Sequence, residues 1–206
     1  MKSNSKPITF KSKRNTVILH SGIVEKHFAS AKAAAFEAQT LQKLHTAGLR
    51  VPEVYALDGA ILKMQYIPGK TLPDLIEHWE NGCTPAEIAA VANSIISWLA
   101  EFYFAVDTKQ TTEIRGDING RNFILDGTYC WGVDFEEKTH GTREQDIGRL
   151  IAFILTYTPP GTPLKIALAD TLLHKAMQVL GVNEQEVCNW RDSELQAMQL
   201  RRIKNS

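Results

Sequence analysis

The sequence predicts an α+β protein with two lobes. The first lobe, residues 1–67, is expected to be a small antiparallel β-sheet with one helix, and residues 68–206 a larger, mainly helical lobe. Two observations support this division: short apolar runs separated by turn dipeptides fill the first third of the chain, and long helical patterns fill the rest. A 206-residue chain with 44% hydrophobic residues has enough apolar material for both cores.

The chain begins with a predicted β-hairpin. Val17–Leu19 and Ile23–Val24 flank Ser21-Gly22, a dipeptide typical of tight turns. Lys26 lies near the end of the second strand.

A helix is expected next, because Ser30 can cap its start and Gly48 is a stop signal. On a period of 3.6 residues, Glu37 shares a face with Ala33, Leu41 and Leu44. A carboxylate on an apolar face needs a partner. We therefore predict an ion pair between Glu37 and Lys26. The alternative is that Glu37 lies at the rim of the face and reaches water.

Another hairpin is predicted around Asp58-Gly59, between Val54–Leu57 and Ile61–Met64. Its second strand leads to Pro68-Gly69, which separates the lobes. Beyond that break, a capping box with proline at the first position, Thr84-Pro85-Ala86-Glu87, predicts the start of a helix that reaches about Ala105. The long apolar stretch Ile88–Val106 contains Asn93, Ser94, Ser97 and Glu101, residues that a membrane span rarely carries, so we expect a buried helix instead.

The most informative stretch is residues 115–136. Asp117 and Asn122 have the spacing D-x-x-x-x-N, and two apolar runs follow, 123–125 and 129–133, joined by the turn dipeptide Asp126-Gly127. The second run ends at Asp134-Phe135. A hairpin would thus carry Asn122 at its entrance and Asp134 at its exit. The simpler interpretation is a polar turn before a strand.

The rest of the chain is predicted to be helical. One helix begins at Asp146, a loop occupies 158–163, and two further helices span about 164–180 and 184–202.

These motifs, in this order, resemble the protein-kinase-like fold, and Arg-Gly-Asp-x4-Asn with Val-Asp-Phe-Glu is similar to the aminoglycoside and choline/ethanolamine phosphotransferase branch. The resemblance implies an ATP- and Mg²⁺-dependent kinase that acts on a hydroxyl group. It implies that Asp117 is the catalytic base, that Asn122 and Asp134 are catalytic residues that bind Mg²⁺, and that Asp146 supports the catalytic loop. It further implies a nucleotide site in which Lys26 contacts the phosphates and Glu37 orients Lys26. The linker that would hydrogen-bond the adenine edge consists of Met64, Gln65, Tyr66 and Ile67.

The chain departs from protein kinases at several points. Arg115 stands where histidine is usual. Lys11–Asn15 occupies the place of the glycine-rich phosphate loop; its basic and hydroxyl groups could cover phosphates, and an ordinary solvated turn is the alternative. Asn119 stands where protein Ser/Thr kinases have a lysine, and only eleven residues, 135–145, follow Asp134 before Asp146. We therefore favour a small-molecule hydroxyl substrate.

Two alternatives stay open. One is a compact atypical Ser/Thr protein kinase resembling the kinase associated with tRNA modification. That family ends in a basic tail, to which Arg201, Arg202 and Lys204 show a weak similarity. The other is a pseudokinase that binds a nucleotide without turnover. An acidic site for a cationic substrate at Glu136, Glu137 and Glu144 is also conceivable, although such a run is more often a solvated connector.

Charge and cysteine content bear on partners and compartment. Lys plus Arg and Asp plus Glu both number 23, so no net field favours nucleic acid or an anionic membrane, while a protein partner is compatible with the sequence. The three cysteines are far apart and the N-terminal residues have no apolar core. Both features predict a cytoplasmic protein without a structural zinc site.

Overall fold

The computed structural model describes residues 7–10, 14–107, 113–137 and 139–204. Its described residues form two compact units. Unit 1 contains the chain up to Pro68 together with Trp131–Glu137, and unit 2 contains the described parts of Gly69–Cys130 and Lys138–Ser206. The sequence placed all residues after Ile67 in the second lobe, whereas the segment 131–137 belongs to the first.

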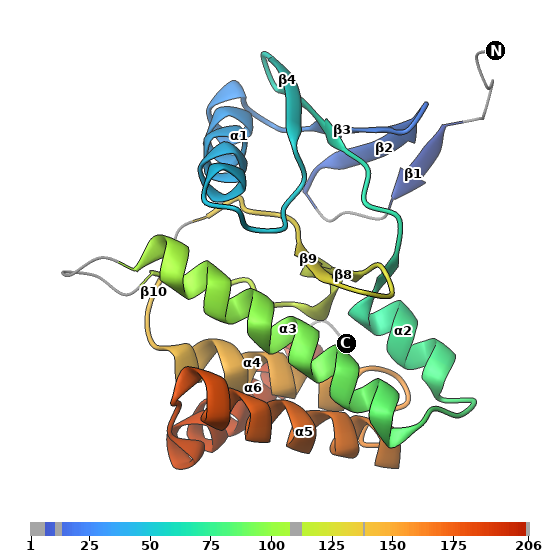
Figure 1. The fold of residues 1–206 in the computed structure, drawn as a ribbon, viewed down its shortest axis with the longest axis vertical. Helices are drawn as coiled ribbons and strands as arrows, with labels where there is room; N and C mark the ends of the chain where they lie inside the picture. Colours follow the sequence, from blue (N-terminus) through green and yellow to red (C-terminus); the bar gives the residue numbers. More distant parts are fainter. Residues whose placement is uncertain (1–6, 11–13, 108–112, 138, 205–206) are drawn as a thin grey trace. The chain divides into compact units, whose positions relative to one another are not determined.

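Unit 1 is built on a five-stranded antiparallel sheet with the order β1-β2-β3-β5-β4 (Figure 1). The hairpin predicted at Ser21-Gly22 is present, with φ of 52° and 79° at these two residues. The second hairpin turns at Asp58–Ala60, and its register shifts once between Val54 and Ala56. The strands are β1 (Ile8–Phe10), β2 (Thr16–His20), β3 (Ile23–His27), β4 (Val54–Asp58) and β5 (Ile61–Gln65).

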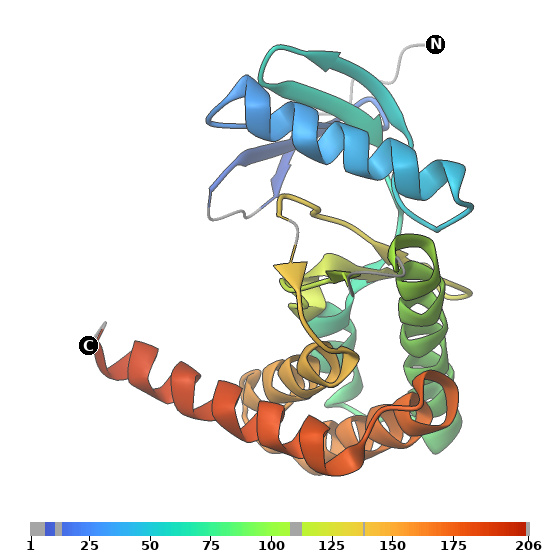
Figure 2. The same cartoon turned by 90° about the vertical axis from the view of Figure 1, so that its left-hand side faces the viewer.

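The single helix of unit 1, α1 (Ala31–Thr46), packs along this sheet against β4 and β5 (Figure 2). The Ser30 side chain accepts a hydrogen bond from the Ala33 backbone N–H at 3.2 Å, so the predicted cap is present. The buried face contains Glu37 with Leu41 and Leu44, but Ala34 rather than Ala33 completes it. Glu37 is therefore inside the core of unit 1, not at its rim.

Unit 2 is mainly helical. The helix predicted from Pro85 is α3 (Pro85–Val106), with its capping box formed between Thr84 and Glu87. It packs against α5, while α4 packs against both α5 and α6. Figure 2 shows α6 running along the outside of this helical layer. The remaining helices are α2 (Leu72–Trp79), α4 (Arg143–Thr156), α5 (Pro163–Leu180) and α6 (Glu184–Lys204).

Length and composition alone would allow α3 to cross a membrane. Most of its large side chains, however, face the interior of unit 2, although Phe104 is exposed: Trp98 stacks on Phe102, with ring centroids 5.6 Å apart, and both are almost fully buried. Burial of this kind identifies α3 as a core helix.

Three short strands and one helix were not predicted. Strand β6 (Lys70–Thr71) pairs with β8 (Phe123–Leu125), and β7 (Glu113–Ile114) pairs with β10 (Thr139–His140). Strands of two residues show no alternation that a sequence could display. Helix α2 did have a signal, since Thr71 and Asp74 form a capping box with proline at the second helical position.

The start of α4 was predicted too late. Thr142 is its N-cap and accepts from the Gln145 N–H at 3.2 Å, so Asp146 lies in the first turn and does not begin the helix. The hairpin β8–β9 is present as predicted, but β9 (Cys130–Gly132) is shorter than the apolar run 129–133. Asp126 closes its turn by accepting from the Thr128 and Tyr129 N–H groups.

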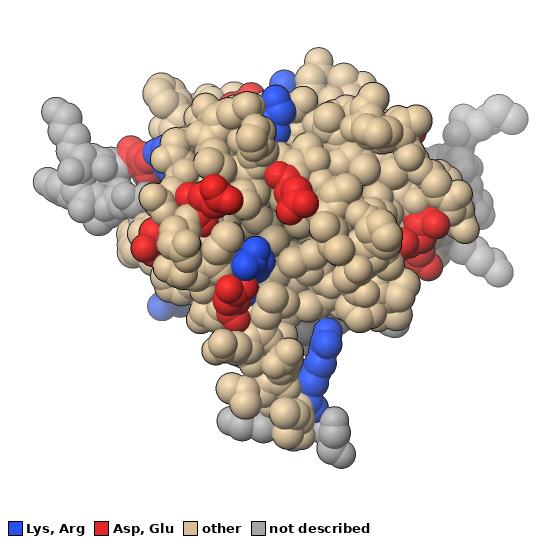
Figure 3. Space-filling view, turned by 90° about the horizontal axis from the view of Figure 1, so that it is seen from below, with Lys and Arg blue, Asp and Glu red and all other residues tan. Residues whose placement is uncertain are grey.

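The face of unit 2 formed around α5 and α6 carries acidic and basic side chains in small, mixed groups (Figure 3). Among the described residues on this face, the basic side chains are not gathered into one patch (Figure 3).

A glycine sets the packing of α4 against α6. A Cβ atom at Gly148 would lie 2.6 Å from the Val187 carbonyl oxygen and 2.8 Å from the Arg191 backbone nitrogen. Both neighbours are backbone atoms, so they can yield only if α6 moves.

We expect Gly148→Ala to destabilise the protein by about 1–3 kcal/mol, because overpacking exceeds the gain of up to ~1 kcal/mol in helix propensity. Urea unfolding measures the change. Ser97→Ala, at an exposed position of α3, is the control and should stay within about 0.5 kcal/mol. A more stable Gly148→Ala protein would show that α6 is not held at this distance.

Candidate active site

Lys26 is the centre of a charged cluster inside unit 1. Its ammonium group lies 2.7 Å from Glu37 Oε2, 2.7 Å from Asp134 Oδ1 and 2.9 Å from Glu136 Oε1. The predicted ion pair between Lys26 and Glu37 is thus present, and both side chains are almost completely buried, at 5% and 1% exposure. The contact comes about because Lys26 points from β3 toward the buried face of α1.

Burial and charge pull the pKa values in this cluster in opposite directions. Burial by itself would lower the pKa of Lys26, but the charges of Glu37 and Asp134 outweigh it, and the pKa is raised above that of an ordinary lysine. Burial raises the pKa of Glu37, the charge of Asp134 adds to this, and Lys26 opposes it. Lys26 therefore stays an ammonium ion at every physiological pH.

The segment that carries Asp134 is fixed to unit 1 by its backbone. Phe135 donates its N–H to Glu37 Oε1 at 3.3 Å, and Gly132 donates to the Arg50 carbonyl at 3.1 Å. Asp134 adopts φ of 67°, a conformation that Asp and Asn tolerate better than most residues. Its side chain is 40% exposed while one oxygen remains on Lys26.

In unit 2, Asp146 holds the loop that precedes Asp117. Its carboxylate accepts from the backbone N–H groups of Arg115 at 2.7 Å and Gly116 at 3.0 Å, and from the Tyr103 hydroxyl at 3.0 Å. Burial raises the pKa of Asp146, and these donors oppose the rise. Asp146 occupies the supporting position that the sequence predicted for it.

The loop from Asp117 to Asn122 presents one exposed acid and one buried amide. The carboxylate of Asp117 is exposed, and its main-chain carbonyl accepts from Asn122 Nδ2 at 2.9 Å. That bond orients the Asn122 side chain, because an amide that donates through its nitrogen turns its oxygen the other way.

Asn119 has a structural role in this loop. Its side chain accepts from the Arg121 N–H at 3.1 Å and from the Tyr157 hydroxyl at 3.2 Å, and caps the 3₁₀ turn Gly120–Asn122. The simpler interpretation of this stretch, a polar turn before a strand, thus holds for Asn119.

The linker proposed for the adenine edge leaves the sheet at Gln65. The Gln65 N–H donates to the Glu53 carbonyl at 2.9 Å, so this donor is used inside the sheet. Met64 and Ile67 are buried, whereas Gln65 and Tyr66 are partly exposed.

The structure brings four residues of unit 1 together, of which only three were selected from the sequence: Lys26, Glu37 and Asp134. The fourth is Glu136, which the sequence indicated only as part of an acidic run, either a site for a cationic substrate or a solvated connector. Arg14 and Asn15, from the turn before β2, bond to Glu137 and Glu136 respectively. Lys11–Lys13, expected to take part in covering phosphates, lie outside the described residues. Asp117, Asn122 and Asp146 form a second group, in unit 2.

The donor set fits Mg²⁺. Carboxylate oxygens of Glu37, Asp134 and Glu136 lie within 4.8 Å of one another, but Glu37 is buried against Lys26. Asp134 is the most exposed of the three and can turn an oxygen outward. In unit 2, the Asn122 side chain offers an amide oxygen, another ligand type that Mg²⁺ accepts.

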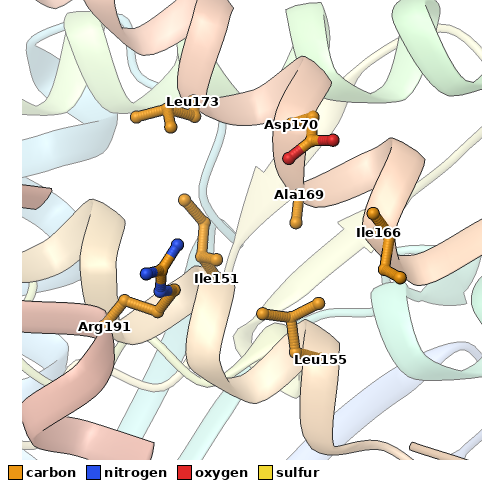
Figure 4. A pocket seen from close by; sticks show the side chains of 7 residues that line it. All are labelled: Ile151, Leu155, Ile166, Ala169, Asp170, Leu173 and Arg191. Atoms are coloured by element: carbon orange, nitrogen blue, oxygen red, sulfur yellow. The ribbon is translucent and has the colours of Figure 1, made fainter. Parts of the chain in front are cut away.

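A small cavity of about 180 Å³ lies elsewhere, between α4, α5 and α6 (Figure 4). Asp170 and Arg191 line it together with aliphatic side chains. It contains none of the residues selected from the sequence.

The comparisons with known proteins agree on the fold. A family model described as RIO domain matches residues 10–151, about two thirds of the chain. No curated protein matches the sequence significantly.

Several solved structures are similar over nearly the whole chain. The streptomycin–ATP–APH(2")-IIa ternary complex has a TM-score of 0.65 at 13% identity and covers 94% of this chain and 84% of its own. The ADP-bound aminoglycoside phosphotransferase APH(2'')-Ib has a TM-score of 0.59 at 14% identity, with coverage of 93% and 92%. A choline/ethanolamine kinase family protein from Mesorhizobium loti has a TM-score of 0.54 at 14% identity, with coverage of 96% and 88%. The predicted protein-kinase-like fold is therefore confirmed.

The buried cluster allows a test of coupling. We expect Lys26→Met to destabilise the protein by about 3–5 kcal/mol, since it leaves three carboxylates without their counter-ion. Glu37→Gln should cost less, and the double variant should cost less than the two singles together, by roughly 0.5–3 kcal/mol.

Denaturant unfolding of the four proteins gives the coupling energy. The matched control is Lys63→Met with Glu25→Gln, a pair at 3.0 Å on the same sheet with side chains 43% and 31% exposed, where about 1 kcal/mol or less is expected. Additive effects at Lys26 and Glu37 would mean that the buried contact does not couple them.

Proposed function

The chain belongs to the RIO domain family, and from this premise we propose that it is a kinase that transfers the γ-phosphoryl group of ATP to a hydroxyl group of a small molecule. The observation that carries the kinase assignment is the buried ion pair of Lys26 and Glu37 with Asp134 beside it. A strand lysine, a helix glutamate and a metal-binding aspartate are the parts that position phosphates in kinases.

Each residue of unit 1 has a definite task in this proposal. Glu37 orients Lys26, Lys26 binds phosphate oxygens, and Phe135, which donates its N–H to Glu37, keeps Asp134 in place. The backbone groups of Tyr66 and Ile67, together with Met64 and Gln65, provide the adenine edge of the site. ATP- and ADP-bound relatives of the same fold support a nucleotide site.

The residues of unit 2 act on the acceptor. Asp117 accepts the proton of the attacking hydroxyl, and the hydroxyl oxygen forms a bond to the γ-phosphorus as the bond to ADP breaks. Asp146 holds Arg115 and Gly116, and so positions Asp117. Asn122 and Asp134 would hold Mg²⁺, which neutralises the negative charge of the phosphates.

The short connector after Asp134 supports a small acceptor. Its described residues are already committed: Glu136 and Glu137 bond to Asn15 and Arg14, β10 pairs with β7, and Thr142 caps α4. These contacts leave little of its described length for a peptide-binding surface. Asn119, which caps the turn at Gly120, replaces the lysine of peptide kinases.

The second candidate is an atypical protein kinase, and the family match favours it. This activity differs only in the acceptor, so the same residues would serve. A pseudokinase is disfavoured because Lys26, Glu37, Asp117, Asn122 and Asp134 are all present. We place either activity in the cytoplasm, in line with Cys83, Cys130 and Cys188, which form no disulfide.

Asp134 is expected to carry the metal-dependent part of nucleotide affinity. Asp134→Asn retains the side-chain shape and tolerates the positive φ, but removes the charge that attracts Mg²⁺. Calorimetry with ATP should show that adding Mg²⁺ no longer tightens binding. Asp58→Asn, in an exposed hairpin turn, is the control. An unchanged Mg²⁺ dependence would remove Asp134 from the metal site.

Asp117 is expected to act in turnover rather than in binding. Asp117→Asn should reduce the rate by about 10²- to 10⁴-fold, the usual range for a general base, and should leave ATP affinity near that of the wild type. Asp170→Asn on the exposed face of α5 is the control. A normal rate for Asp117→Asn would mean that another group takes the proton.

The acceptor class is tested with labelled ATP and a metabolite extract. A labelled small compound, lost in Asp117→Asn, is the expected result. Label found only on protein would establish the atypical protein kinase instead.

A further inference from the structure

Glu136 occupies a position where a nucleotide phosphate would be expected. Its Oε1 atom forms an ion pair with Lys26 Nζ at 2.9 Å and accepts a hydrogen bond from the side-chain amide of Asn15. A carboxylate oxygen and a phosphate oxygen are both anionic acceptors and satisfy the same donors. An ammonium and an amide N–H converging on one anionic oxygen form a small anion subsite.

Three carboxylates surround Lys26. Its ammonium group donates hydrogen bonds to Glu37 and Asp134 at 2.7 Å each, and Glu136 Oε1 lies 2.9 Å away as an ion pair. An ammonium group has three N–H bonds, so a phosphate oxygen that takes the third donor would compete with Glu136 for the space beside Nζ.

Glu136 is the carboxylate that can leave. Glu37 is 1% exposed and also accepts from the Phe135 N–H, so its release would break the core of unit 1. Asp134 is the proposed metal ligand. Glu136 has the longest of the three contacts, is 21% exposed, and is followed by Glu137, whose pair with Arg14 is solvated at 70% and 73% exposure.

We propose that Lys26 and Asn15 form a phosphate subsite, that Glu136 fills it in the nucleotide-free protein, and that the phosphates of ATP displace Glu136. This inference rests on the proposed function. It assigns a nucleotide-binding role to Asn15, in a chain whose phosphate-covering turn has no glycine, and makes Glu136 an internal competitor that sets nucleotide affinity.

The proposal is tested with Glu136→Gln, which keeps the shape of the side chain but removes its charge. Glu137→Gln is the matched control, one residue further along the same segment. Calorimetry is performed on both variants and on the wild type with ATP, ADP and adenosine, with and without Mg²⁺.

We expect Glu136→Gln to bind ATP and ADP about 10- to 100-fold more tightly than the wild type, the value of one charge-assisted hydrogen bond. Adenosine affinity should not change, since adenosine has no phosphate, and Glu137→Gln should behave as the wild type. Weaker binding of Mg·ATP by Glu136→Gln would overturn the proposal and make Glu136 a metal ligand. An equal gain in adenosine affinity would also overturn it, because the gain would then not depend on the phosphates.

Asn15 is tested in the Glu136→Gln background, where the subsite is no longer blocked. Asn15→Ala should then weaken ATP and ADP binding and leave adenosine unaffected. An unchanged ATP affinity would remove Asn15 from the subsite.

A measurement without nucleotide provides an independent readout. Glu136→Gln should lower the thermal midpoint of the nucleotide-free protein, because a contact to Lys26 is lost, whereas Glu137→Gln should not. Should Glu136→Gln not fold, Glu136→Asp, which keeps the charge but shortens the reach, replaces it and should tighten ATP binding to a smaller extent. If no protein in the series binds ATP, the proposed function fails as well, whereas equal ATP affinity throughout overturns only the displacement.

Discussion

The buried ammonium of Lys26 is the contact on which unit 1 depends. It joins β3 to α1 through Glu37, and it joins both to the segment 131–137 through Asp134 and Glu136. A charge inside a protein must be paired. The pairing therefore draws a segment that is remote in sequence onto the sheet, and makes that segment part of the first unit although the chain has already crossed to the second.

In unit 2, a buried anion holds a loop in a comparable way. The carboxylate of Asp146 accepts two backbone N–H groups and the Tyr103 hydroxyl, so a loop without regular structure has its donors satisfied. Arg143 adds to this neighbourhood: it forms an ion pair with Asp107 at 2.6 Å and lies over the Tyr103 ring. The two units thus use opposite charges in the same way: each buried charge holds a loop from its buried side.

Much of this arrangement could be predicted from local signals. Ser21-Gly22 and the caps at Ser30 and Thr84 specify their turns and helices by short-range chemistry, which a sequence shows directly. Glu37 could be paired with Lys26 because a carboxylate on an apolar face restricts the possibilities. The two-residue strands β7 and β10 could not be found, because their pairing depends on residues 25 positions apart, Ile114 and Thr139.

Glu136 was missed for a different reason. In sequence it is one of several acids in a short connector, and nothing local separates it from Glu137. Only the fold distinguishes them, because one acid reaches Lys26 and the other a solvated arginine. The contact between Asn15 and Glu136 could not be predicted either, because the two residues are 121 positions apart in the sequence.

The glycine before Asp117 has a consequence for control of the enzyme. Gly116 has φ of 69°, and a Cβ atom there would collide with the Thr139 side chain of β10. Protein kinases have an arginine at this place in the motif, and kinases that are switched on by phosphorylation use arginine side chains to hold the modified activation loop. This chain can accommodate no side chain there while β10 keeps its position. An arginine at this position would thus require a different path for residues 139–140.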